Sequence, residues 1–533
     1  MLRFLQPINN NDNQNNKDAN GNPLTEKQIM QQKIQDALHN IFKLDAFRPN
    51  QQAIVESTVI EKRDVLVLMP TGAGKSLCFQ LPGVVNPGLT LVISPLIALM
   101  HDQVTTLQAK NIKANFWNST QKITQIRTIV QDLESGSPAL KFLYTTPESI
   151  TGDKLQSTLR LLAERNQLSL VAIDEAHCIS SWGHDFRPKY RHLSRLKQWF
   201  PNVPMIALTA TATPKVKSDM IATLGLRNPK FYVTSFNRPE ITYEVRYKEL
   251  LDSPISDLRQ FLKQYPGQTG IIYCATKKQV DELCHELSTG SGKLSVRPYH
   301  AGLKLSERKT IQDEWTSGQV KIVVATIAFG MGIDKKDVRF VVHWTIPKSV
   351  EGFYQESGRA GRDKKPAHSL VYYSTKDKAL VEFMLNSSKN RKGSDDDDDG
   401  GDEKRDAIVR KDFEQVCRFC DRAHCRRKFL VEFFGEQLKT DICKGTCDYC
   451  KNKDAVTKRV TQLRKAQENV SYSTSIGSII GGSGKGKSRY VSNDEDIDSF
   501  SDSEYDAMIE PEDNETLNSF SAGLRQARAS INV

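Results

Sequence analysis

A short segment, residues 173–190, combines carboxylates with aromatic and basic side chains. Asp174 and Glu175 follow an apolar run, residues 168–173, that is typical of a buried parallel strand. Open α/β sheets bind ligands at the carboxyl ends of their strands, so both carboxylates are candidates for metal and water chemistry. Side chains suited to stacking on bases and holding phosphates follow them: Trp182, Phe186 and Arg187. The segment therefore predicts an enzyme that converts nucleotide hydrolysis into work on a polynucleotide.

A glycine-rich loop, residues 69–76, is the candidate phosphate site. It follows a strand-like run and opens a helix-compatible one, which is the context that a phosphate loop requires. Lys75 would neutralise the β- and γ-phosphates, and Ser76 would bind Mg²⁺. Asp174 would complete the Mg²⁺ shell, and Glu175 would polarise the attacking water. The alternatives are a glycine-rich turn and an acidic turn at a strand end.

A second stretch, residues 481–488, matches the strict phosphate-loop pattern, whereas the loop at 69–76 has Met69 in place of the first glycine. No buried strand precedes residues 481–488, and the sequence after them is polar and acidic. A phosphate loop needs both a strand and a helix around it, so we interpret this second match as chance.

Composition and length limit the class of protein. A chain of 533 residues predicts two to four domains, and a net charge of +10 fits a polyanionic partner. Because the sequence shows neither a membrane span nor a secretory signal, we expect an intracellular protein without a membrane partner. Six of the ten cysteines lie between Cys417 and Cys450. In a reducing compartment this clustering indicates metal binding rather than disulfides.

Alternating strand-like and helix-like segments predict two α/β domains with parallel sheets, joined near residues 235–239. The expected strands are 65–69, 89–94, 142–145, 168–173 and 205–209 in the first domain, and 270–274, 321–325 and 338–344 in the second. The expected organisation is a disordered Asn-rich N-terminus at 1–25, a first domain at 26–234, a second domain at 235–386, an acidic flexible linker at 387–406, a metal-binding module at 407–455, and a basic helix with a low-complexity acidic tail at 456–533.

The order of these signals resembles the RecQ family of superfamily 2 DNA helicases over about residues 36–450. The resemblance implies two tandem RecA-like domains, a small helical zinc-binding module and disordered termini. Residues 47–51 resemble the family's adenine-recognition motif, and residues 69–76 its phosphate loop, with Met at the first position. The nucleotide-binding residues implied in this way are Arg48, Gln51, Thr71, Gly72, Gly74, Lys75, Ser76, Gly332, Asp334 and Arg359.

The same resemblance assigns the catalytic residues. Residues 174–177 are the family's DEAH box, and residues 355–362 resemble its arginine-containing motif at the domain interface. An arginine offered across such an interface stabilises charge in phosphoryl transfer by a factor of roughly 10³–10⁵. We assign that role to Arg362, with Arg359 beside it on the phosphates; the alternative for either is a solvated basic loop. The implied catalytic residues are Lys75, Asp174, Glu175, His177 and Arg362.

Further motifs imply contacts with DNA. Residues 181–190 resemble the aromatic-rich loop that links DNA binding to hydrolysis, and residues 209–211 resemble the motif that couples the domains. The implied DNA-binding residues are Ser94, Trp182, Phe186, Arg187, Thr276, His300 and Thr326. The resemblance also implies ATP and Mg²⁺ as cofactors, 3′-to-5′ polarity, and single-stranded and tailed duplex DNA as partners.

The cysteines allow two ligand sets. Spacing alone suggests two CxxC pairs, Cys417 with Cys420 and Cys447 with Cys450, as a Cys₄ zinc site. The family's zinc module instead implies Cys425, Cys443, Cys447 and Cys450 as the Zn²⁺ ligands. We favour the second set because the flanking residues match as well.

Several points depart from the family pattern or leave the function open. No winged-helix or HRDC domain is evident after Cys450, so the sequence resembles shorter family members, and strand separation stays open. Residues 458–467 could form a DNA-binding helix or a solvated one. The alternatives to a DNA helicase are an RNA helicase on the same scaffold and an inactive scaffold that recruits a protein partner through the acidic C-terminal tail. The expected location is the nucleus.

Overall fold

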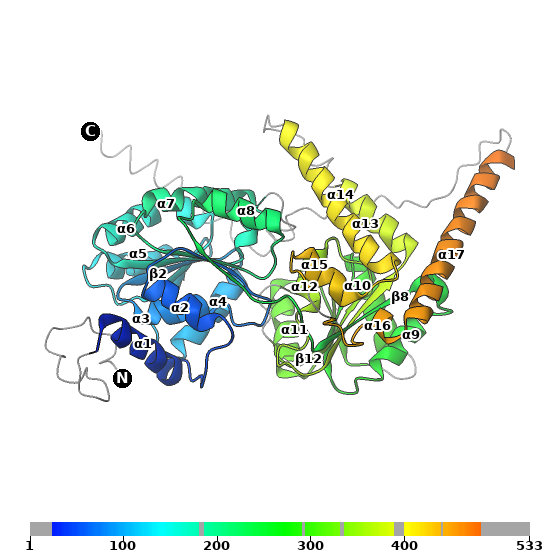
Figure 1. The fold of residues 1–533 in the computed structure, drawn as a ribbon, viewed down its shortest axis with the longest axis horizontal. Helices are drawn as coiled ribbons and strands as arrows, with labels where there is room; N and C mark the ends of the chain where they lie inside the picture. Colours follow the sequence, from blue (N-terminus) through cyan, green and yellow to red (C-terminus); the bar gives the residue numbers. More distant parts are fainter. Residues whose placement is uncertain are drawn as a thin grey trace, which may run out of the picture.

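A computed structural model describes residues 24–180, 186–289, 294–330, 335–387, 399–438 and 441–480. Two α/β units follow one another along the chain, each built on a parallel sheet, and a helical region completes the structure (Figure 1). In Figure 1 the first unit runs from blue to green and lies beside the second, which runs from green to yellow. The predicted fold class and its tandem arrangement are confirmed.

The first sheet consists mostly of continuous apolar strands because helices cover both of its faces. Its strands are β1 (Val65–Leu68), β2 (Leu89–Ile93), β3 (Ala114–Trp117), β4 (Phe142–Thr145), β5 (Leu168–Ile173), β6 (Met205–Thr209) and β7 (Lys230–Val233). They lie in the order β3-β4-β2-β5-β6-β1-β7, and every pairing is parallel. Five lie where the sequence predicts strands. β3 and β7 lie outside those predictions because each is a four-residue edge strand with partly exposed positions.

Two helical layers pack on this sheet. One face is covered by α1 (Glu26–Asp36), a π-helical turn (Ala37–Ile41), α2 (Gln51–Val59), α3 (Leu77–Val85) and α4 (Ile97–Gln108). The other face is covered by α5 (Ile123–Glu134), α6 (Asp153–Glu164), α7 (Leu196–Trp199) and α8 (Pro214–Leu224), together with the 3₁₀ segments Ala176–Ile179 and Pro188–Arg195. Both cores are continuous, so the carboxyl ends of the strands are held as one rigid edge.

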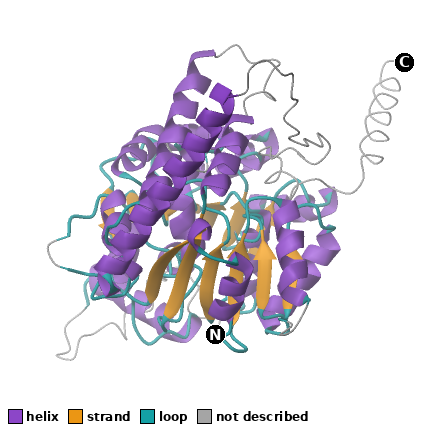
Figure 2. Ribbon diagram, turned by 90° about the vertical axis from the view of Figure 1, so that its right-hand side faces the viewer, coloured by secondary structure: helices purple, strands orange, loops and turns teal. Residues whose placement is uncertain are grey.

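The second sheet has six strands, which Figure 2 shows with helices on either side. They are β8 (Ile241–Tyr247), β9 (Thr269–Tyr273), β10 (Val296–Tyr299), β11 (Ile322–Ala325), β12 (Val338–His343) and β13 (Ala367–Tyr373), in the parallel order β10-β11-β9-β12-β13-β8. The helices of this unit are α9 (Pro254–Leu262), α10 (Lys277–Ser288), α11 (Leu305–Ser317) and α12 (Val350–Ser357). The first sheet ends at Val233 and the second begins at Ile241, on either side of the expected joint.

The helical region contains α13 (Thr375–Ser387), α14 (Asp399–Asp421), α15 (Arg426–Phe433), α16 (Asp448–Lys451) and α17 (Lys453–Ile480). α14 begins inside the segment predicted as a flexible linker, residues 387–406, which corrects the C-terminal end of that prediction. The helix is anchored because Phe413, Val416 and Phe419 are buried in the core beneath it. The expected basic helix at 458–467 is confirmed as part of the first half of α17, which extends away from the second unit in Figure 1.

Several expectations fall outside the part of the chain that the structure describes: the Asn-rich N-terminus, most of the acidic linker, the rejected loop at 481–488 and the acidic tail. Within the described residues, no helix combines the length and the apolar character that crossing a membrane requires.

Candidate functional site

The phosphate loop leaves the carboxyl end of β1 and runs into α3, at the sheet edge that the sequence predicts. Gly72 and Gly74 have φ angles of +79° and +91°, which strain any residue with a side chain, so glycine is needed at both positions. Lys75 Nζ lies 3.3 Å from the Met69 carbonyl oxygen, and Ser76 directly precedes α3. The backbone N–H groups of Leu77, Cys78 and Phe79 donate to the carbonyls of Gly74, Lys75 and Ser76 at 3.3, 3.0 and 3.3 Å, so the loop leads directly into the N-terminus of α3. A helix N-terminus after a glycine-rich loop suits an anion.

Arg48, which precedes α2, and Gln51, its first residue, lie against this loop. Arg48 Nη1 donates a hydrogen bond to the Gly72 carbonyl at 2.5 Å, and Gln51 Nε2 donates to the Gly74 carbonyl at 3.0 Å. The Arg48 backbone N–H also donates to Gln51 Oε1 at 2.8 Å, so the two side chains are ordered together. The structure thus brings the predicted base-reading motif and the predicted phosphate loop into one site.

Asp174 and Glu175 follow β5 at the same edge. Asp174 is only 5% exposed, and burial raises the pKa of its carboxyl to about 6; the negative charge of Glu175 adds to this effect, and Lys75 opposes it. A divalent cation at this position would favour the ionised carboxylate. Glu175 has a φ of +47°, an uncommon conformation for a residue with a side chain.

A line of polar contacts joins Glu175 to the second unit. Glu175 Oε2 lies 3.4 Å from His177 Nδ1, and the same nitrogen lies 2.8 Å from Thr209 Oγ1. Thr209 Oγ1 in turn donates to the Thr211 carbonyl at 3.0 Å. Gln355 Nε2, from α12, donates to Thr211 Oγ1 at 3.1 Å. His177 therefore connects the candidate water-activating carboxylate to the domain interface.

The two predicted arginines occupy different places. Arg362 lies over the phosphate loop, since a Cβ added at Gly72 would meet Arg362 Cγ at 3.1 Å. Arg359 is 8% exposed and donates to the Gly330 carbonyl within its own unit. Arg362 is therefore the one of the two that this structure places against the phosphate loop.

Arg238, at the joint between the sheets, is a residue of this interface that sequence reasoning missed. Its guanidinium is buried and pairs with Glu240 at 2.5 Å. It donates to the Thr71 carbonyl of the phosphate loop at 3.3 Å, and to the carbonyls of Gly358 and Ala360 at 3.1 and 2.9 Å. The sequence offered one signal for Arg238: it is a basic residue directly before a proline, Pro239, at the expected joint between the domains.

The predicted DNA contacts fall into two groups. The side chains of Ser94, His300 and Thr326 are buried, with 1%, 6% and 0% exposure. Thr276 caps α10 by accepting a hydrogen bond from the Gln279 backbone N–H at 3.1 Å. In this conformation Ser94, His300 and Thr326 present little surface, and among the described residues the Ser94 and Thr326 hydroxyls have no hydrogen-bond partner.

Phe186 and Arg187 are half-buried at the end of the aromatic-rich segment. Arg187 Nη1 donates to the Pro95 carbonyl at 3.1 Å, which joins this segment to the loop after β2. Arg191 lies over the Phe186 ring at 5.3 Å from its centroid. The predicted residues Trp182, Gly332 and Asp334 lie outside the described residues.

A second site lies in the helical region, where four cysteines converge. The sulfur atoms of Cys425, Cys443, Cys447 and Cys450 all lie within 4.8 Å of one another. A tetrahedral zinc ion with Zn–S bonds of about 2.3 Å needs sulfurs about 3.8 Å apart, so the cluster fits zinc. Within the cluster, hydrogen bonds from Cys425 and Cys447 lower the pKa of Cys443, whereas the pKa values of Cys425 and Cys450 are raised. A bound metal would favour the thiolate at all four cysteines.

Cys417 and Cys420 do not belong to this cluster. Both are buried on α14 in the core that α14 shares with β8 and β13. Burial raises the pKa of the Cys417 thiol to about 12. Of the two ligand sets considered from the sequence, the geometry fits the one with Cys425 and Cys443.

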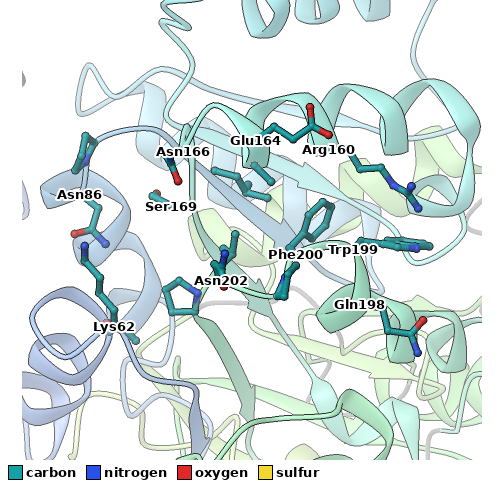
Figure 3. Close-up of a pocket in the computed structure, with 17 residues that line it drawn as sticks. Lys62, Asn86, Arg160, Glu164, Asn166, Ser169, Gln198, Trp199, Phe200 and Asn202 are labelled. Atoms are coloured by element: carbon teal, nitrogen blue, oxygen red, sulfur yellow. The ribbon is translucent and has the colours of Figure 1, made fainter.

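A hollow of about 510 Å³ lies at the opposite edge of the first sheet (Figure 3). It is lined by Leu168, the first residue of β5, and by Arg160, which lies over the Trp199 ring at 5.8 Å. None of the predicted site residues lines it. The hollow is therefore separate from the chemistry at the carboxyl ends of the strands.

Three family models match successive parts of the chain. A DEAD/DEAH box helicase model matches residues 48–219, a helicase conserved C-terminal domain matches residues 253–364, and a RecQ zinc-binding model matches residues 375–451. The phosphate loop, the Arg362 loop and the four cysteines each fall in a different one of these matches.

Curated proteins share this core. The chain is 40% identical to mouse ATP-dependent DNA helicase Q5 over 450 residues, which is 82% of this chain and 45% of that protein. It is 41% identical to the ATP-dependent helicase SGS1 of Saccharomyces cerevisiae, over 78% of this chain and 28% of that protein. It is 40% identical to the ATP-dependent DNA helicase RecQ of Pasteurella multocida, over 79% and 62%. The chain thus spans about half or less of the two eukaryotic relatives.

Solved structures share the fold. The helicase MrfA bound to DNA superposes with a TM-score of 0.55 at 19% identity, covering 69% of this chain and 54% of that one. Mycobacterium smegmatis helicase Lhr, bound to single-stranded DNA and AMP-PNP, gives a TM-score of 0.51 at 19% identity, covering 73% and 57%. These likenesses establish the tandem architecture.

Proposed function

Because the chain belongs to the RecQ family of superfamily 2 helicases, we propose that it is an ATP-dependent DNA helicase. It couples ATP hydrolysis to translocation along single-stranded DNA in the 3′-to-5′ direction and to the unwinding of duplexes. One observation carries this proposal: Arg362 of the second unit lies against Gly72 in the phosphate loop of the first. Hydrolysis at such a shared site can move two domains against each other, which is what translocation requires.

ATP binding falls to residues at the carboxyl edge of the first sheet. Gln51 reads the adenine, and Arg48, Thr71, Gly72 and Gly74 shape the loop around the phosphates. Lys75 neutralises the phosphate charge, and Ser76 and Asp174 would hold Mg²⁺, which would supply further charge neutralisation to the phosphates. Two observations support ATP binding at this loop: the φ angles of Gly72 and Gly74, and the contacts of Arg48 and Gln51 with the loop.

Hydrolysis needs a base for water and positive charge for the transition state. Glu175 orients and polarises the attacking water, and Arg362 stabilises the charge on the transferred phosphoryl group. Arg359, Gly332 and Asp334 are proposed as further nucleotide-binding residues on the resemblance of their motifs alone. His177 links Glu175 to Thr209, so hydrolysis is sensed at the domain interface through the contact of Thr211 with Gln355.

DNA binds along both units on the side of these loops. Trp182, Phe186 and Arg187 contact the strand and report its presence to Glu175 through their shared segment. Ser94, Thr276, His300 and Thr326 lie on the loops at the strand ends through which further DNA contacts are proposed, and in this conformation their side chains are buried or engaged in a helix cap. The substrates are single-stranded DNA and tailed duplexes, and the cellular roles are DNA replication, repair and recombination.

The zinc site is structural. It holds the helical region together because its ligands come from the start of α15, from the start and end of a loop, and from α16.

The acidic C-terminal segment would bind a protein partner, and the protein would act in the nucleus. A fluorescent fusion of the chain tests the location, and diffuse cytoplasmic signal contradicts it.

Unwinding of matched tailed duplexes tests the proposal. Two duplexes share one double-stranded sequence and differ only in carrying a 3′ or a 5′ single-stranded tail, and each is incubated with ATP or AMP-PNP. We expect strand release with ATP and the 3′ tail only. DNA-stimulated ATP hydrolysis without release of either duplex would reduce the proposal to a translocase, and release from the 5′ tail would reverse its polarity.

A further inference from the structure

Arg427, on α15, is a buried guanidinium that binds the backbone of the joint between the two units. It is 1% exposed, and among the described residues no carboxylate lies within ion-pair distance of it, whereas the adjacent Arg426 pairs with Asp448 at 3.0 Å. Its hydrogen bonds end on neutral oxygens: Asn237 Oδ1 at 2.9 Å, the carbonyls of Arg238 and Ile241 at 2.5 Å each, and Thr446 Oγ1 at 2.8 Å. Burying a guanidinium without a counter-ion is costly, so its placement needs this full set of acceptors.

Thr446 connects Arg427 to the zinc cluster. It lies between the ligands Cys443 and Cys447, and its hydroxyl donates to the Cys443 carbonyl at 2.5 Å while accepting from Arg427. The Thr446 carbonyl accepts from the Tyr243 backbone N–H at 3.2 Å, next to a bridge between Tyr243 and Cys447. A metal bound to the sulfurs of Cys443 and Cys447 would therefore also hold in place Thr446 Oγ1, which accepts a hydrogen bond from the Arg427 guanidinium.

Arg238 connects the other end of Arg427 to the nucleotide loop. Its carbonyl accepts from Arg427, while its own guanidinium holds the carbonyls of Thr71, Gly358 and Ala360. Arg362 follows two residues after Ala360. The backbone of Arg238 is thus held by the zinc-binding region, and its side chain contacts both loops that meet at the phosphate site.

Other contacts also anchor the zinc-binding region at this joint. Glu436 accepts from the Ser235 hydroxyl at 2.7 Å and from the Phe236 backbone N–H at 2.9 Å, and Phe434 stacks on Phe236 with centroids 4.5 Å apart. A change confined to the Arg427 fork therefore leaves the region attached.

We propose that Arg427 is a positioning residue that holds Arg238 in place, and through Arg238 the phosphate loop and the Arg362 loop. How firmly it does so depends on how well the zinc-binding loop, residues 443–447, is ordered. This role rests on the proposed ATP hydrolysis. It predicts that the zinc cluster, which does not touch the nucleotide site, changes both nucleotide affinity and turnover through one side chain.

Arg427→Lys is the first variant, because it keeps the positive charge but cannot reach the joint and Thr446 together with a single ammonium group. The matched control is Arg426→Lys, which disturbs an equally buried arginine of the same helix that contacts Asp448 instead of the joint. We expect Arg427→Lys to retain one zinc per chain and its affinity for single-stranded DNA, while kcat/KM for ATP falls about tenfold. Its affinity for a fluorescent ATP analogue is expected to fall with it.

Thr446→Val is the second variant, because it removes the hydroxyl at nearly constant volume and leaves Arg427 its contacts with the joint. We expect it to lower kcat/KM for ATP in the zinc-loaded protein, and the double variant with Arg427→Lys to be no worse than Arg427→Lys alone. Wild-type kinetics in either zinc-loaded variant would overturn the proposal. A second result would also overturn the proposal: Arg427→Lys, Thr446→Val and Arg426→Lys all lose activity in proportion to their loss of zinc and their drop in melting temperature. A merely structural role gives that result.

Binding measurements separate this proposal from the function on which it rests. If the wild-type chain binds the ATP analogue but does not hydrolyse ATP, the proposed function fails while the effect of Arg427→Lys on analogue affinity still tests the positioning role. If the wild-type chain hydrolyses ATP and both variants match it, only the positioning role fails.

Discussion

Arg362 and Gly72 meet across the interface of the two α/β units, where a methyl group added to Gly72 would lie 3.1 Å from Arg362 Cγ. The contact is made by the methylene carbons of Arg362, so the side chain that carries the proposed charge lies against the loop proposed to hold the ATP phosphates. Because the two residues belong to different units, the site is complete only while the units are held together.

Arg362→Ala should lower kcat for ATP hydrolysis by about 10³ or more, the low end of what loss of an arginine from a phosphoryl-transfer site costs. Arg362→Lys should recover little of it, since an ammonium group does not reproduce the guanidinium fork. Steady-state kinetics with single-stranded DNA measures both. Lys365→Ala, an exposed lysine in the same loop, is the control and should behave as wild type.

Gly72→Ala should lower ATP hydrolysis strongly, because the added methyl group presses on Arg362 and the backbone has a φ of +79°. The matched control is Gly136→Ala, where φ is +86° and nothing lies within 4 Å of the added carbon. Both variants should lose about 1 kcal/mol of stability from backbone strain. Equal hydrolysis rates in the two variants would show that the contact with Arg362 is irrelevant to turnover.

Cys425→Ala and Cys450→Ala should each abolish stoichiometric zinc and lower the melting temperature, because zinc binding contributes folding free energy. Cys417→Ala should keep one zinc per chain, since Cys417 lies on α14 outside the cluster. Metal analysis of the purified proteins decides between the sets. Zinc loss in the Cys417 variant that matches the loss in the Cys425 variant would refute the assignment.

Glu351, on α12, gives a pH-dependent stability. Burial raises the pKa of its carboxyl to about 8, and the charge of Asp412 adds to the effect. A raised folded-state pKa means that the folded chain holds the proton more tightly than the unfolded chain, so stability is lost as pH rises toward 8. Between pH 6 and 9 the loss should be about 2–3 kcal/mol.

The Glu351→Gln variant should not show this loss, so its melting temperature relative to wild type should rise across the same pH range. Calorimetry at several pH values measures the difference. A difference that stays constant from pH 6 to 9 would show that Glu351 ionises normally in the folded protein.

The sequence predicted the parts of the site that lie close together along the chain. The phosphate loop, the Asp174–Glu175 pair and the central strands have local signatures, because a continuous apolar run followed by a glycine loop or an acidic pair defines a strand end. The four zinc ligands also come from one short region. The set with Cys425 and Cys443 was favoured over the set with Cys417 and Cys420 because the residues around it resemble the family's zinc module. The geometry of the cluster fits that set.

The residues that sequence reasoning missed act between distant segments. Arg238 reaches Thr71 across 167 positions, and Arg427 reaches Arg238 across 189. Nothing in the local pattern around Arg427 indicates a buried guanidinium facing carbonyl oxygens. The start of α14 at Asp399 was missed for a related reason, because the apolar residues that anchor the helix follow a run of like charges.

The proposed coupling requires that polynucleotide binding drives ATP hydrolysis at the Arg362–Gly72 interface. Its most direct test is the ATP hydrolysis rate of one wild-type preparation with and without single-stranded DNA, with Glu175→Gln as a matched preparation that lacks the water-polarising carboxylate. We predict that DNA raises the wild-type rate several-fold, and that the variant is slower by at least about 10² under both conditions. A wild-type rate that DNA leaves unchanged, or a Glu175→Gln variant that hydrolyses ATP at the wild-type rate, would contradict this coupling.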